Sequence, residues 1–554
     1  MNHLNPLSLA GIAALITLAA PASAQPLVQW QKSLGGTGSD YVNEVRQTAD
    51  GGYVAVGNTD SNNGDVSGNH GGSDAWVVKT AANGTVLWQK CLGGTGGDVG
   101  YGIRETFDHG FAMVGYTGST DGNVSGNHGY RDAWVVKLDN TGAILWQKCL
   151  GGSGYDEAYS IIQTADSGFV ICGYTGSTDG DVSGNHGTYD AWVVKLNKAG
   201  ALQWQKCLGG TASDFAYSVR PTSDGGYAVI ANTQSTNGDV TGNHGSSDIW
   251  ALKLDASGTL LWQTCLGGTA AEQGYSMEQT ADGGYILAGY TASNNGNVSG
   301  NHGSQDAWVV KLNSSGTLQW QKCLGGTAAD QGYSVLPTPD GGYIMAGYAK
   351  SNNGDVSGNH GDNDAWLVKL GGTGTIQWQK CFGGTAADGA LSVQLTSDGW
   401  YILAGSAASN NGDVSGNHGG AADAWVVKLG CANQVVVNIT ADANPAQLSW
   451  ELRDSGGSLL ASGAPTVANT VNSSTVCLSA NPGPGCYTFK LMDSFGDGIA
   501  AGGWNLRTTG GGLILKDSFS SGSVSPANPP ATAAYGSVHS FCLPLGSANI
   551  ETAR

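Results

Sequence analysis

The sequence predicts an all-β protein: a seven-bladed β-propeller whose N-terminal strand closes the last blade, followed by a β-sandwich or jelly-roll domain. A Trp-Gln-Lys motif, once Trp-Gln-Thr, recurs seven times at intervals of 58 residues, from Trp30 to Trp378. The chain contains 90 glycines, and aromatic and β-branched runs lie between its glycine-rich turns, which is typical of short strands. Long internal periods of this kind mark propeller blades of four strands each.

Each repeat predicts four strands, which the unit that starts at Trp320 illustrates. The first contains the alternating run Tyr333–Leu336, and an Asp-Gly-Gly turn leads to the second at Tyr343–Tyr348. A long glycine-rich loop, SNNGDVSGNHG, leads to the third at Asp364–Leu370, and a further turn leads to the fourth at Thr375–Phe382. Asp-Gly and Gly-Gly favour hairpin turns because they accept the positive φ that such turns require.

The two ends of the repeat region predict how the ring closes. The region begins with a lone fourth strand at Leu27–Leu34, and the seventh repeat ends after its third strand at Asp423–Leu429. We expect the N-terminal strand to complete the last blade, because closure removes the exposed sheet edges that an open stack would leave. Residues 25–430 are therefore predicted to form one propeller.

Residues 1–24 predict a signal peptide. An apolar stretch at Leu7–Ala20 precedes Pro21 and a small-residue cleavage site, Ala22-Ser23-Ala24. A short membrane anchor is the alternative, but the stretch is short for a membrane span and Pro21 interrupts it. These features predict a protein that is secreted or held at the outer cell surface, with no other membrane-spanning segment.

The charge balance limits the class of partner. The formal net charge is −19, whereas nucleic acids and anionic membrane surfaces need a basic patch on the protein that binds them. We therefore expect no nucleic-acid partner. An acidic, self-repelling chain also suits a soluble monomer.

Tryptophan and cysteine recur at fixed repeat positions. Two tryptophans per repeat lie mid-strand among apolar residues, which predicts packing between blades rather than platforms on which sugars stack. Six cysteines share one repeat position, and equivalent residues on neighbouring blades lie about 10 Å apart, too far for a disulfide. We therefore expect these cysteines and Cys172 to be buried thiols. The six are Cys91, Cys149, Cys207, Cys265, Cys323 and Cys381.

The loops between second and third strands and those between consecutive repeats should emerge on one face of the propeller. Both are glycine-rich here, and ligands usually bind a scaffold where its loops are elaborated. The candidate binding residues on this loop face are the Asp and His of the long loop. They are Asp65, His70, Asp181, His186, Asp239, His244, Asp355, His360, Asp413 and His418.

The same residues raise the question of a metal site. Seven histidines on seven blades cannot converge on one zinc ion, which needs three or four ligands about 2 Å away. Calcium prefers Asp, Asn and backbone carbonyl ligands, but the loop lacks the Asp-x-Asp-x-Asp-Gly spacing. The alternative is that Asp, Asn and Ser cap backbone amides of the loop and that His forms local hydrogen bonds.

No catalytic constellation can be identified in the repeats. An active site needs a few residues in distinct roles, whereas sevenfold copying places the same residues in every blade. We therefore expect a protein that is not an enzyme. The departures from the repeat are scattered along the chain and include Arg46, Arg104, His109, Arg131, Phe215, Arg220, Lys350 and Asp362.

Through the motifs GG-x3-D, DGGY-x3-G and DAWVVKL-x3-G-x3-W, residues 25–430 resemble the seven-bladed β-propeller repeat family of secreted bacterial proteins. The resemblance implies a fold and an exported location, and it implies no reaction. The repeats also look like the quinoprotein dehydrogenase propeller, but that family has eight blades and often an adjacent cysteine pair. We therefore expect no organic cofactor.

Residues 431–544 lack the repeat and predict a β-sandwich, because short alternating segments lie between Gly, Pro and Ser turns. The run GCYTFKLMDSFGDGIAAGGWNL resembles the C-terminal β-sandwich modules of secreted bacterial proteases and adhesins, and cargo of the type IX secretion route looks similar up to this point. The sorting domain of such cargo is absent, and residues 545–554 form a polar tail, so either the chain is truncated or the resemblance misleads about the export route. The segments are 435–440, 447–452, 486–492, 504–508 and 513–516.

Asp493 and Asp497 in this module are candidate calcium ligands. They match positions 1 and 5 of a calcium loop, but Phe495 occupies position 3, so the turn is not an EF-hand; the alternative is an Asx turn that closes a hairpin. Cysteines of an exported protein can form disulfides. Cys477–Cys486 and Cys431–Cys542 are the pairs we expect, and other pairings stay open.

These observations favour a non-catalytic secreted or cell-surface binding or adhesion protein, whose loop face binds glycan or protein. One alternative is a secreted propeller enzyme, a polysaccharide hydrolase or lyase, with a site in the central mouth of the ring. Another is a purely structural surface protein. The ligand cannot be predicted from the sequence.

Overall fold

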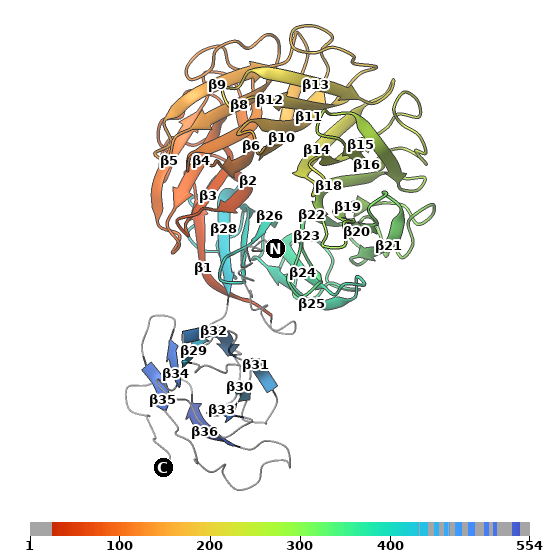
Figure 1. Cartoon of the computed structure of the whole chain (residues 1–554). Coiled ribbons are helices and arrows are strands. Elements are labelled where there is room, and N and C mark those ends of the chain that lie inside the picture. The colour runs from red at the N-terminus through yellow and green to blue at the C-terminus, as the bar shows by residue number, and fades with distance from the viewer. Residues whose placement is uncertain are drawn as a thin grey trace, which may run out of the picture. The chain divides into compact units, whose positions relative to one another are not determined.

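The computed structural model describes residues 25–430, 433–440, 448–453, 459–463, 465, 471–478, 486–493, 504–508, 513–517 and 535–542. The predicted signal peptide and the polar tail lie outside the described residues. Residues 25–430 form one compact unit of seven four-stranded antiparallel sheets, arranged as a ring (Figure 1). The repeated sheets confirm the predicted β-propeller fold. Among the described residues, no helix is long and apolar enough to span a bilayer.

Four classes of strand run from the axis of the ring to its outer side. The innermost strands are β2 (Asp40–Gln47), β6 (Asp98–Glu105), β10 (Asp156–Gln163), β14 (Asp214–Pro221), β18 (Glu272–Gln279), β22 (Asp330–Pro337) and β26 (Asp388–Leu395). The second strands are β3 (Tyr53–Thr59), β7 (Phe111–Thr117), β11 (Phe169–Thr175), β15 (Tyr227–Thr233), β19 (Tyr285–Thr291), β23 (Tyr343–Ala349) and β27 (Tyr401–Ala407). The third strands are β4 (Asp74–Thr80), β8 (Asp132–Leu138), β12 (Asp190–Leu196), β16 (Asp248–Leu254), β20 (Asp306–Leu312), β24 (Asp364–Leu370) and β28 (Asp423–Gly430). The outer strands are β5 (Val86–Leu92), β9 (Ile144–Leu150), β13 (Leu202–Leu208), β17 (Leu260–Leu266), β21 (Leu318–Leu324), β25 (Ile376–Phe382) and β1 (Leu27–Leu34).

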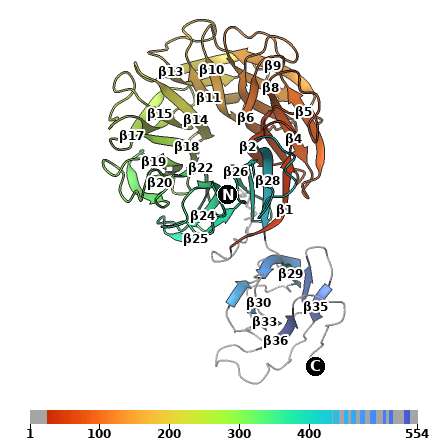
Figure 2. The same cartoon turned by 180° about the vertical axis from the view of Figure 1, so that it is seen from behind.

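The N-terminal strand closes the ring, as the offset ends of the repeat region predict. The last sheet has the order β1-β28-β27-β26, and β1 pairs antiparallel with β28, with Leu27 opposite Gly430 and Leu34 opposite Ala424. Figures 1 and 2 show these two strands side by side from opposite sides of the ring. The innermost strands β2 and β26 are also in contact. Closure therefore joins strands nearly 400 residues apart.

The repeat motifs are explained by one hydrogen-bonded group per sheet. On the third strand β8, Trp134 is fully buried, and its indole Nε1 donates to Oε1 of Gln147 on β9 at 2.9 Å. The Gln147 amide donates in turn to Ser125 Oγ in the long loop at 2.7 Å. The Trp of one motif, the Gln of the next and the Ser of the loop are thus held together because a buried indole N–H needs an acceptor.

The core lies between adjacent sheets. One cluster combines Val54 and Val56 of β3 with Trp134 and Val136 of the next sheet, and similar clusters fill the other interfaces. The tryptophans of the third strands are all at most 2% exposed. Those of the outer strands pack against the next sheet, and all but the buried Trp378 are partly exposed. The Trp88 ring, for example, meets Phe111 edge-on at 5.7 Å. The prediction of core packing holds fully only for the third-strand set.

The seven repeat cysteines are buried and free, as predicted. Burial raises the pKa of the Cys149 thiol to about 12, with a smaller effect from the charge of Asp132. A raised pKa keeps a thiol protonated, so we expect these cysteines to be structural residues of low reactivity.

Every innermost strand contains a β-bulge at the same position. On β6 the register shifts between Gly100 and Gly102, so that Tyr101 has no partner on β7. A side chain on Gly115 of β7 would overlap the carbonyl oxygen of Val99, and six of the seven second strands carry glycine there, with Ala231 on β15 as the exception. A bulge re-aims the side chain of the extra residue, and five of the seven bulges present tyrosine.

The C-terminal residues form eight strands in two antiparallel sheets, β32-β29-β34-β35 and β31-β30-β33-β36. Alternate residues of β29, β30, β33 and β34, such as Val437, Trp450, Phe489 and Leu506, form one buried cluster. Five strands match predicted segments, whereas β31, β32 and β36 were not predicted because their sequences mix small and polar residues. The bounds are β29 (Asn433–Thr440), β30 (Leu448–Arg453), β31 (Leu459–Gly463), β32 (Val471–Leu478), β33 (Cys486–Asp493), β34 (Trp504–Thr508), β35 (Leu513–Asp517) and β36 (Tyr535–Cys542).

Candidate functional site

On the loop face, a buried carboxylate at the start of each innermost strand binds the neighbouring loops. The carboxylate is an aspartate in six repeats and Glu272 in the fifth. Asp330 is 0% exposed. Its Oδ1 accepts from the backbone N–H groups of Lys350 and Ser351 at 2.9 and 3.0 Å. Its Oδ2 accepts from Gly326 N at 2.8 Å and Ser351 Oγ at 2.7 Å. One side chain thus fixes the long loop against the loop that joins consecutive repeats.

The long-loop histidines pair with the first residue of the third strand. In all seven repeats the His Nδ1 lies 2.6–2.7 Å from the Asp Oδ2, and the His backbone N–H donates to the same oxygen. Because the carboxylate accepts from Nδ1–H, the histidine is oriented locally. The pairs are His70–Asp74, His128–Asp132, His186–Asp190, His244–Asp248, His302–Asp306, His360–Asp364 and His418–Asp423.

The Asp residues that precede these histidines cap the loop that joins the repeats. Asp65 Oδ2 accepts from Gly35 N at 3.3 Å. Asn123 Oδ1 accepts from Gly93 N at the same distance. Asp and Asn serve equally as this acceptor, so their exchange between repeats needs no metal to explain it. Asp181, Asp239, Asp355 and Asp413 make the same contact. Within the described part of the chain, no group of three or more His, Cys, Asp and Glu side chains is placed to hold a metal ion.

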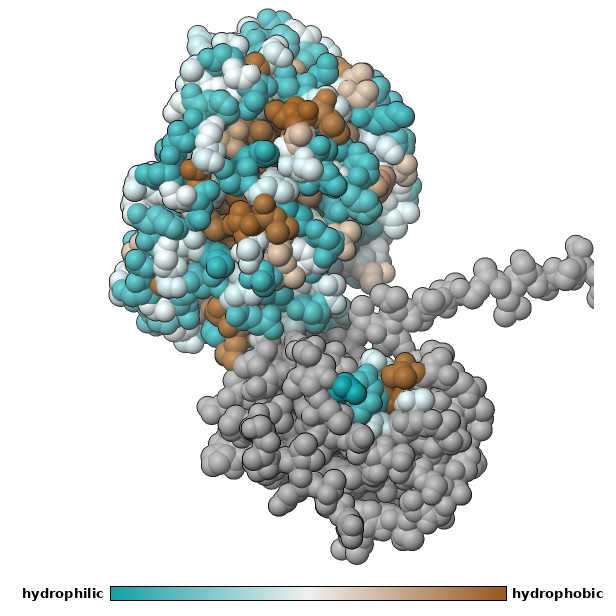
Figure 3. All heavy atoms as spheres, turned by 90° about the vertical axis from the view of Figure 1, so that its left-hand side faces the viewer, coloured by the Kyte–Doolittle hydropathy of each residue, from teal (hydrophilic) through white to brown (hydrophobic). Residues whose placement is uncertain are grey.

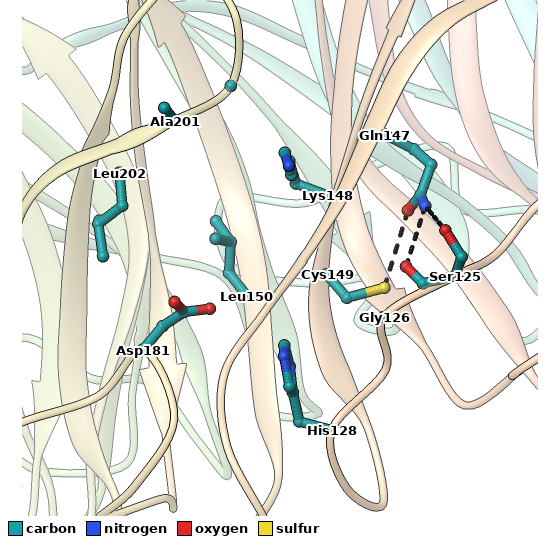
Figure 4. A pocket seen from close by; sticks show the side chains of 11 residues that line it. Ser125, Gly126, His128, Gln147, Lys148, Cys149, Leu150, Asp181, Ala201 and Leu202 are labelled. Atoms are coloured by element: carbon teal, nitrogen blue, oxygen red, sulfur yellow. Dashed lines mark hydrogen bonds between the residues drawn. The ribbon is translucent and has the colours of Figure 1, made fainter.

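The structure adds a contact between neighbouring repeats that the spacing did not suggest. At the closing seam of the ring, His418 Nε2 lies 3.7 Å from Asp65 Oδ2 of the next repeat. The equivalent pair His128 and Asp181 flanks a pocket of about 420 Å³ between the second and third sheets. Figure 4 shows these two side chains reaching into the pocket from opposite sides. Its wall includes Lys148 and Gln147, so the pocket is polar and suits a small polar group.

The same seam, between the sheet β6–β9 and the sheet β10–β13, carries an aromatic cluster on the loop face. The rings of Tyr130 and Tyr155 stack at 5.2 Å with an interplanar angle of 11°, although they are 70% and 40% exposed. The Arg131 guanidinium lies 4.4 Å from the Tyr116 ring centre, and its Nη1 donates to Glu157 Oε1 at 3.1 Å. We call Tyr116, Tyr130, Arg131, Tyr155 and Glu157 the rim cluster.

The rim cluster exists in one repeat interface only. Positions equivalent to Tyr130 hold Gly72, Thr188, Ser246, Ser304 and Asp362, with an insertion in the seventh repeat. Positions equivalent to Tyr155 hold Ser39, Gly97, Ser213, Ala271, Ala329 and Ala387. The place of the Arg131–Glu157 ion pair is taken by two glutamines, Gln305 and Gln331, in a later interface, where the amides pair at 2.7 Å. The fold therefore needs neither aromatic residues at the Tyr130 and Tyr155 positions nor an ion pair at the Arg131 and Glu157 positions, and it does not explain the rim cluster.

The rim cluster continues into a row of tyrosines around the axis of the ring. The Tyr159 hydroxyl donates to Glu157 Oε2 at 3.1 Å. Tyr159 belongs to five bulge tyrosines whose consecutive ring centres lie 4.6–5.4 Å apart. Burial raises the pKa of the Tyr217 hydroxyl to about 12, so the row stays neutral. The five are Tyr101, Tyr159, Tyr217, Tyr275 and Tyr333.

Several departures that are scattered along the chain come together in space. Arg131 lies in the rim cluster, and Phe215 lies against Tyr189 at the next seam, at 5.6 Å. Arg46, Arg104 and Arg220 occupy one position on innermost strands. An alignment of the seven repeats that marked the largest changes at exposed positions would have selected Tyr130 and Tyr155, which the sequence interpretation missed. Lys350 and Asp362 form a separate surface pair at 2.9 Å, and His109 pairs with Glu105 at 3.3 Å in another exposed place.

The outer side of the ring carries apolar residues in some repeats only. Leu87, Leu145 and Leu261 are 55–57% exposed, where other repeats have Gln203, Gln319 and Gln377. Figure 3 shows brown patches on the side of the ring that carries β5 and β9.

Most of the residues predicted to bind calcium or form disulfides lie outside the part of the chain that the structure describes. Asp497 and Cys431 lie outside the described residues, and so do the side chains of Asp493, Cys477, Cys486 and Cys542. Calcium at this turn and both disulfides stay predictions. In the backbone register of β33 and β36, however, Cys486 is directly opposite Cys542. Opposite residues of paired strands lie about 4.5–5.5 Å apart at Cα, so this register adds a Cys486–Cys542 bridge to the possible pairings.

Comparisons with known proteins show no family. No family model matches the chain. The regulatory protein FlaEY of Caulobacter vibrioides is 25% identical over 303 residues, which cover 49% of this chain and 31% of that protein. The chain thus spans about a third of the length of this curated relative.

Three solved structures illustrate the structural similarity. The WD40 domain of Neurospora crassa Pan2 has a TM-score of 0.39 and 9% identity, covering 74% of this chain and 97% of that one. PorZ, a surface component of the type IX secretion system of Porphyromonas gingivalis, has a TM-score of 0.40 and 12% identity, covering 87% and 60%. The polysaccharide lyase Uly1 has a TM-score of 0.39 and 11% identity, covering 74% and 94%. Scores this low carry no functional argument.

Proposed function

We propose that the protein is a non-catalytic, secreted or cell-surface binding protein whose seven-bladed propeller binds a glycan at the rim cluster. The C-terminal module would be an accessory β-sandwich. The observation that carries the proposal is the stacked, exposed pair Tyr130–Tyr155 beside the Arg131–Glu157 ion pair. No other repeat has an aromatic residue at the position of Tyr130 or of Tyr155.

The cost of these side chains to the free protein supports a ligand. Tyr130 leaves 70% of its surface in water, and exposed apolar area is unfavourable by about 25 cal/mol per Å². A sugar ring presents C–H groups on one face, which pack on an aromatic ring, and hydroxyl groups at its edge. Arg131, whose side chain is 43% exposed, supplies donors for those hydroxyls, and the buried Glu157 holds its guanidinium group in place.

Catalysis fits the rim cluster less well. Most glycoside hydrolases use two carboxyl groups about 5–9.5 Å apart, and the rim cluster contains one, Glu157. Both of its oxygens already accept hydrogen bonds, from Arg131 and Tyr159. The alternative, a polysaccharide hydrolase or lyase acting at the mouth of the ring, remains a separate hypothesis that the experiment below distinguishes.

Binding of the full chain to immobilised neutral and acidic polysaccharides tests the proposal, with isothermal titration of the oligosaccharide that binds. We expect Tyr130→Ala and Tyr155→Ala to weaken binding about 5–30-fold each, as for aromatic contacts at the centre of an interface. Phe107→Ala is the matched control, because Phe107 is an aromatic residue 66% exposed in the turn after β6, at the opposite end of the sheet from the loop face.

Two results would overturn the proposal. One is glycan binding that survives in the Tyr130→Ala/Tyr155→Ala double variant, or no binding to any of the polysaccharides. The other is release of reducing ends or unsaturated products by the wild type that Glu157→Gln abolishes while binding persists, which would make the protein an enzyme.

A further inference from the structure

Charged side chains gather around the axis of the ring at a second place, nearer the tight turns than the tyrosine row. The penultimate residue of the innermost strand is Arg46 on β2, Arg104 on β6, Arg220 on β14 and Glu278 on β18. The other three repeats have Ile162, Leu336 and Gln394 there. Glu44 is also exceptional, because its position holds glycine or serine in the other six repeats.

Two of the arginines share one carboxylate. Glu44 Oε1 lies 2.6 Å from Arg46 Nη2 and 2.6 Å from Arg104 Nη1. Arg46 also donates from Nη1 to Gln394 Oε1 at 2.6 Å. Burial raises the pKa of Glu44, but the charges of Arg104, Arg46 and Arg220 outweigh this effect and hold the pKa at about 2. Arg220 therefore also interacts electrostatically with Glu44.

Arg220 has its own carboxylate. Its Nε donates to Glu278 Oε1, and its Nη1 donates to the carbonyl oxygen of Val219 at 2.9 Å and to Ser160 Oγ at 3.3 Å. These five charged side chains are only 14–19% exposed. We call Glu44, Arg46, Arg104, Arg220 and Glu278 the axial cluster.

The axial cluster carries one positive charge in excess, three guanidinium groups against two carboxylates, in a chain whose net charge is −19. A nearly buried charge without a counter-charge is unfavourable. Arg104 is the least favourably placed of the three arginines. Burial, and then the neighbouring charge of Arg46, lower its pKa to about 9. Among the described residues, Arg104 donates only from Nη1, which leaves its Nε and Nη2 groups for a ligand.

We propose that the axial cluster binds an oxyanion (a carboxylate, sulfate or phosphate group) through Arg104 and Arg220. Guanidinium groups suit this role because their planar donors match the oxygen geometry of carboxylates and oxyanions. The partial exposure of the cluster lets solvent and small ions reach it. This proposal does not rest on the proposed function of the rim cluster, from which it differs in residues and in ligand charge.

Thermal unfolding and titration calorimetry of the full chain test the proposal, with sodium sulfate, sodium phosphate and sodium galacturonate as separate probes. Sodium chloride at equal ionic strength is the reference. At saturating concentration the bound oxyanion should raise Tm by about 2–5 °C, because only the folded state binds it, and the three probes rank the chemical source of the anion.

Arg104→Gln should abolish this rise and weaken binding at least tenfold, while its Tm without oxyanion equals or exceeds that of the wild type, because two arginines then face two carboxylates. Lys350→Gln, at an exposed surface pair, makes the same change in net charge and should keep the effect. If Arg104→Gln fails to fold, Arg104→Lys keeps the charge, loses the planar fork and should bind measurably more weakly.

The proposal is overturned if no probe raises Tm beyond chloride, if Arg104→Gln and Arg220→Gln keep the wild-type rise, or if Lys350→Gln loses it. It is also overturned if the rise disappears in Tyr130→Ala, since the anion would then bind at the rim cluster. Glycan binding that fails while oxyanion binding succeeds contradicts the proposed function alone.

Discussion

Replacing Asp306 by asparagine should stabilise the propeller, although it removes a charge that recurs in all seven repeats. Asp306 Oδ2 accepts two hydrogen bonds from His302. Its Oδ1 is buried and has no hydrogen-bond partner, as is the equivalent oxygen in the other six repeats. A methyl group on Gly325 would lie 2.9 Å from this oxygen and 2.7 Å from Asp330 Oδ2. Two carboxylates of adjacent repeats thus flank one glycine.

The size of the effect follows from the unpaired acceptor. Leaving a buried acceptor without a donor costs about 1–3 kcal/mol. Burial raises the pKa of Asp306, and the charge of Asp330 adds a smaller rise. An amide at Asp306 keeps an oxygen for His302 and turns an N–H donor toward Asp330. We therefore expect Asp306→Asn to increase the free energy of unfolding by about 1–3 kcal/mol and Tm by about 1–5 °C.

The pH dependence identifies the cause. Because the pKa of Asp306 is raised in the folded state, the folded protein holds this proton more readily than the unfolded chain does. Wild-type stability from this group is therefore lost as the pH rises from the ordinary value of 3.8 through the raised pKa. The advantage of Asp306→Asn should be largest at neutral pH and smallest near pH 4, as measured by urea unfolding across this range.

Asp330→Asn is the matched control, because both Asp330 oxygens accept two hydrogen bonds. An amide nitrogen there would face donors, so we expect a loss of about 3 kcal/mol or more. If Asp306→Asn destabilised the protein as Asp330→Asn does, or gained nothing at neutral pH, the reasoning from the unpaired oxygen would be refuted.

Three further predictions use the departures from the repeat and the cited pKa shifts. Ser167 has a φ of 63° where Gly51 and Gly225 have 82° and 83°; Ser167→Gly should raise the free energy of unfolding by about 1 kcal/mol, and no change in a urea midpoint would contradict this. The Thr164 hydroxyl and then Lys195 hold the pKa of Asp166 at about 2, so its contribution to stability is lost only as the pH falls toward 2. Thr164→Val should shift that loss to higher pH in a Tm series, and superimposable curves would refute it. The thiol of Cys149, whose pKa burial raises to about 12, should react with a maleimide only after denaturation, as should the other repeat thiols; rapid labelling of the native protein, read by peptide mass spectrometry, would show that the cores open.

Only part of the candidate site could be predicted from the sequence. The hydrogen bond between His302 and Asp306 joins residues four positions apart, and local spacing suggested it. Tyr130 and Tyr155 come from different sheets and depart from the repeat, so the features that the repeats share could not predict them. The C-terminal strands β31, β32 and β36 were also missed, since strand pairing there does not depend on a clear apolar alternation.

The amino-acid sequence by itself determined the repeat, the four strands of each unit and the closing strand at Leu27–Leu34, because these depend on local alternation, turn chemistry and a period visible along the chain. The tertiary structure decided which exceptional residues act together. Arg46 reaches Gln394 across 348 residues, and His418 meets Asp65 across the closing seam. Such contacts arise only when the sheets wrap around one axis, because the geometry of closure, and no local propensity, sets which side chains face the centre and which face a neighbouring repeat.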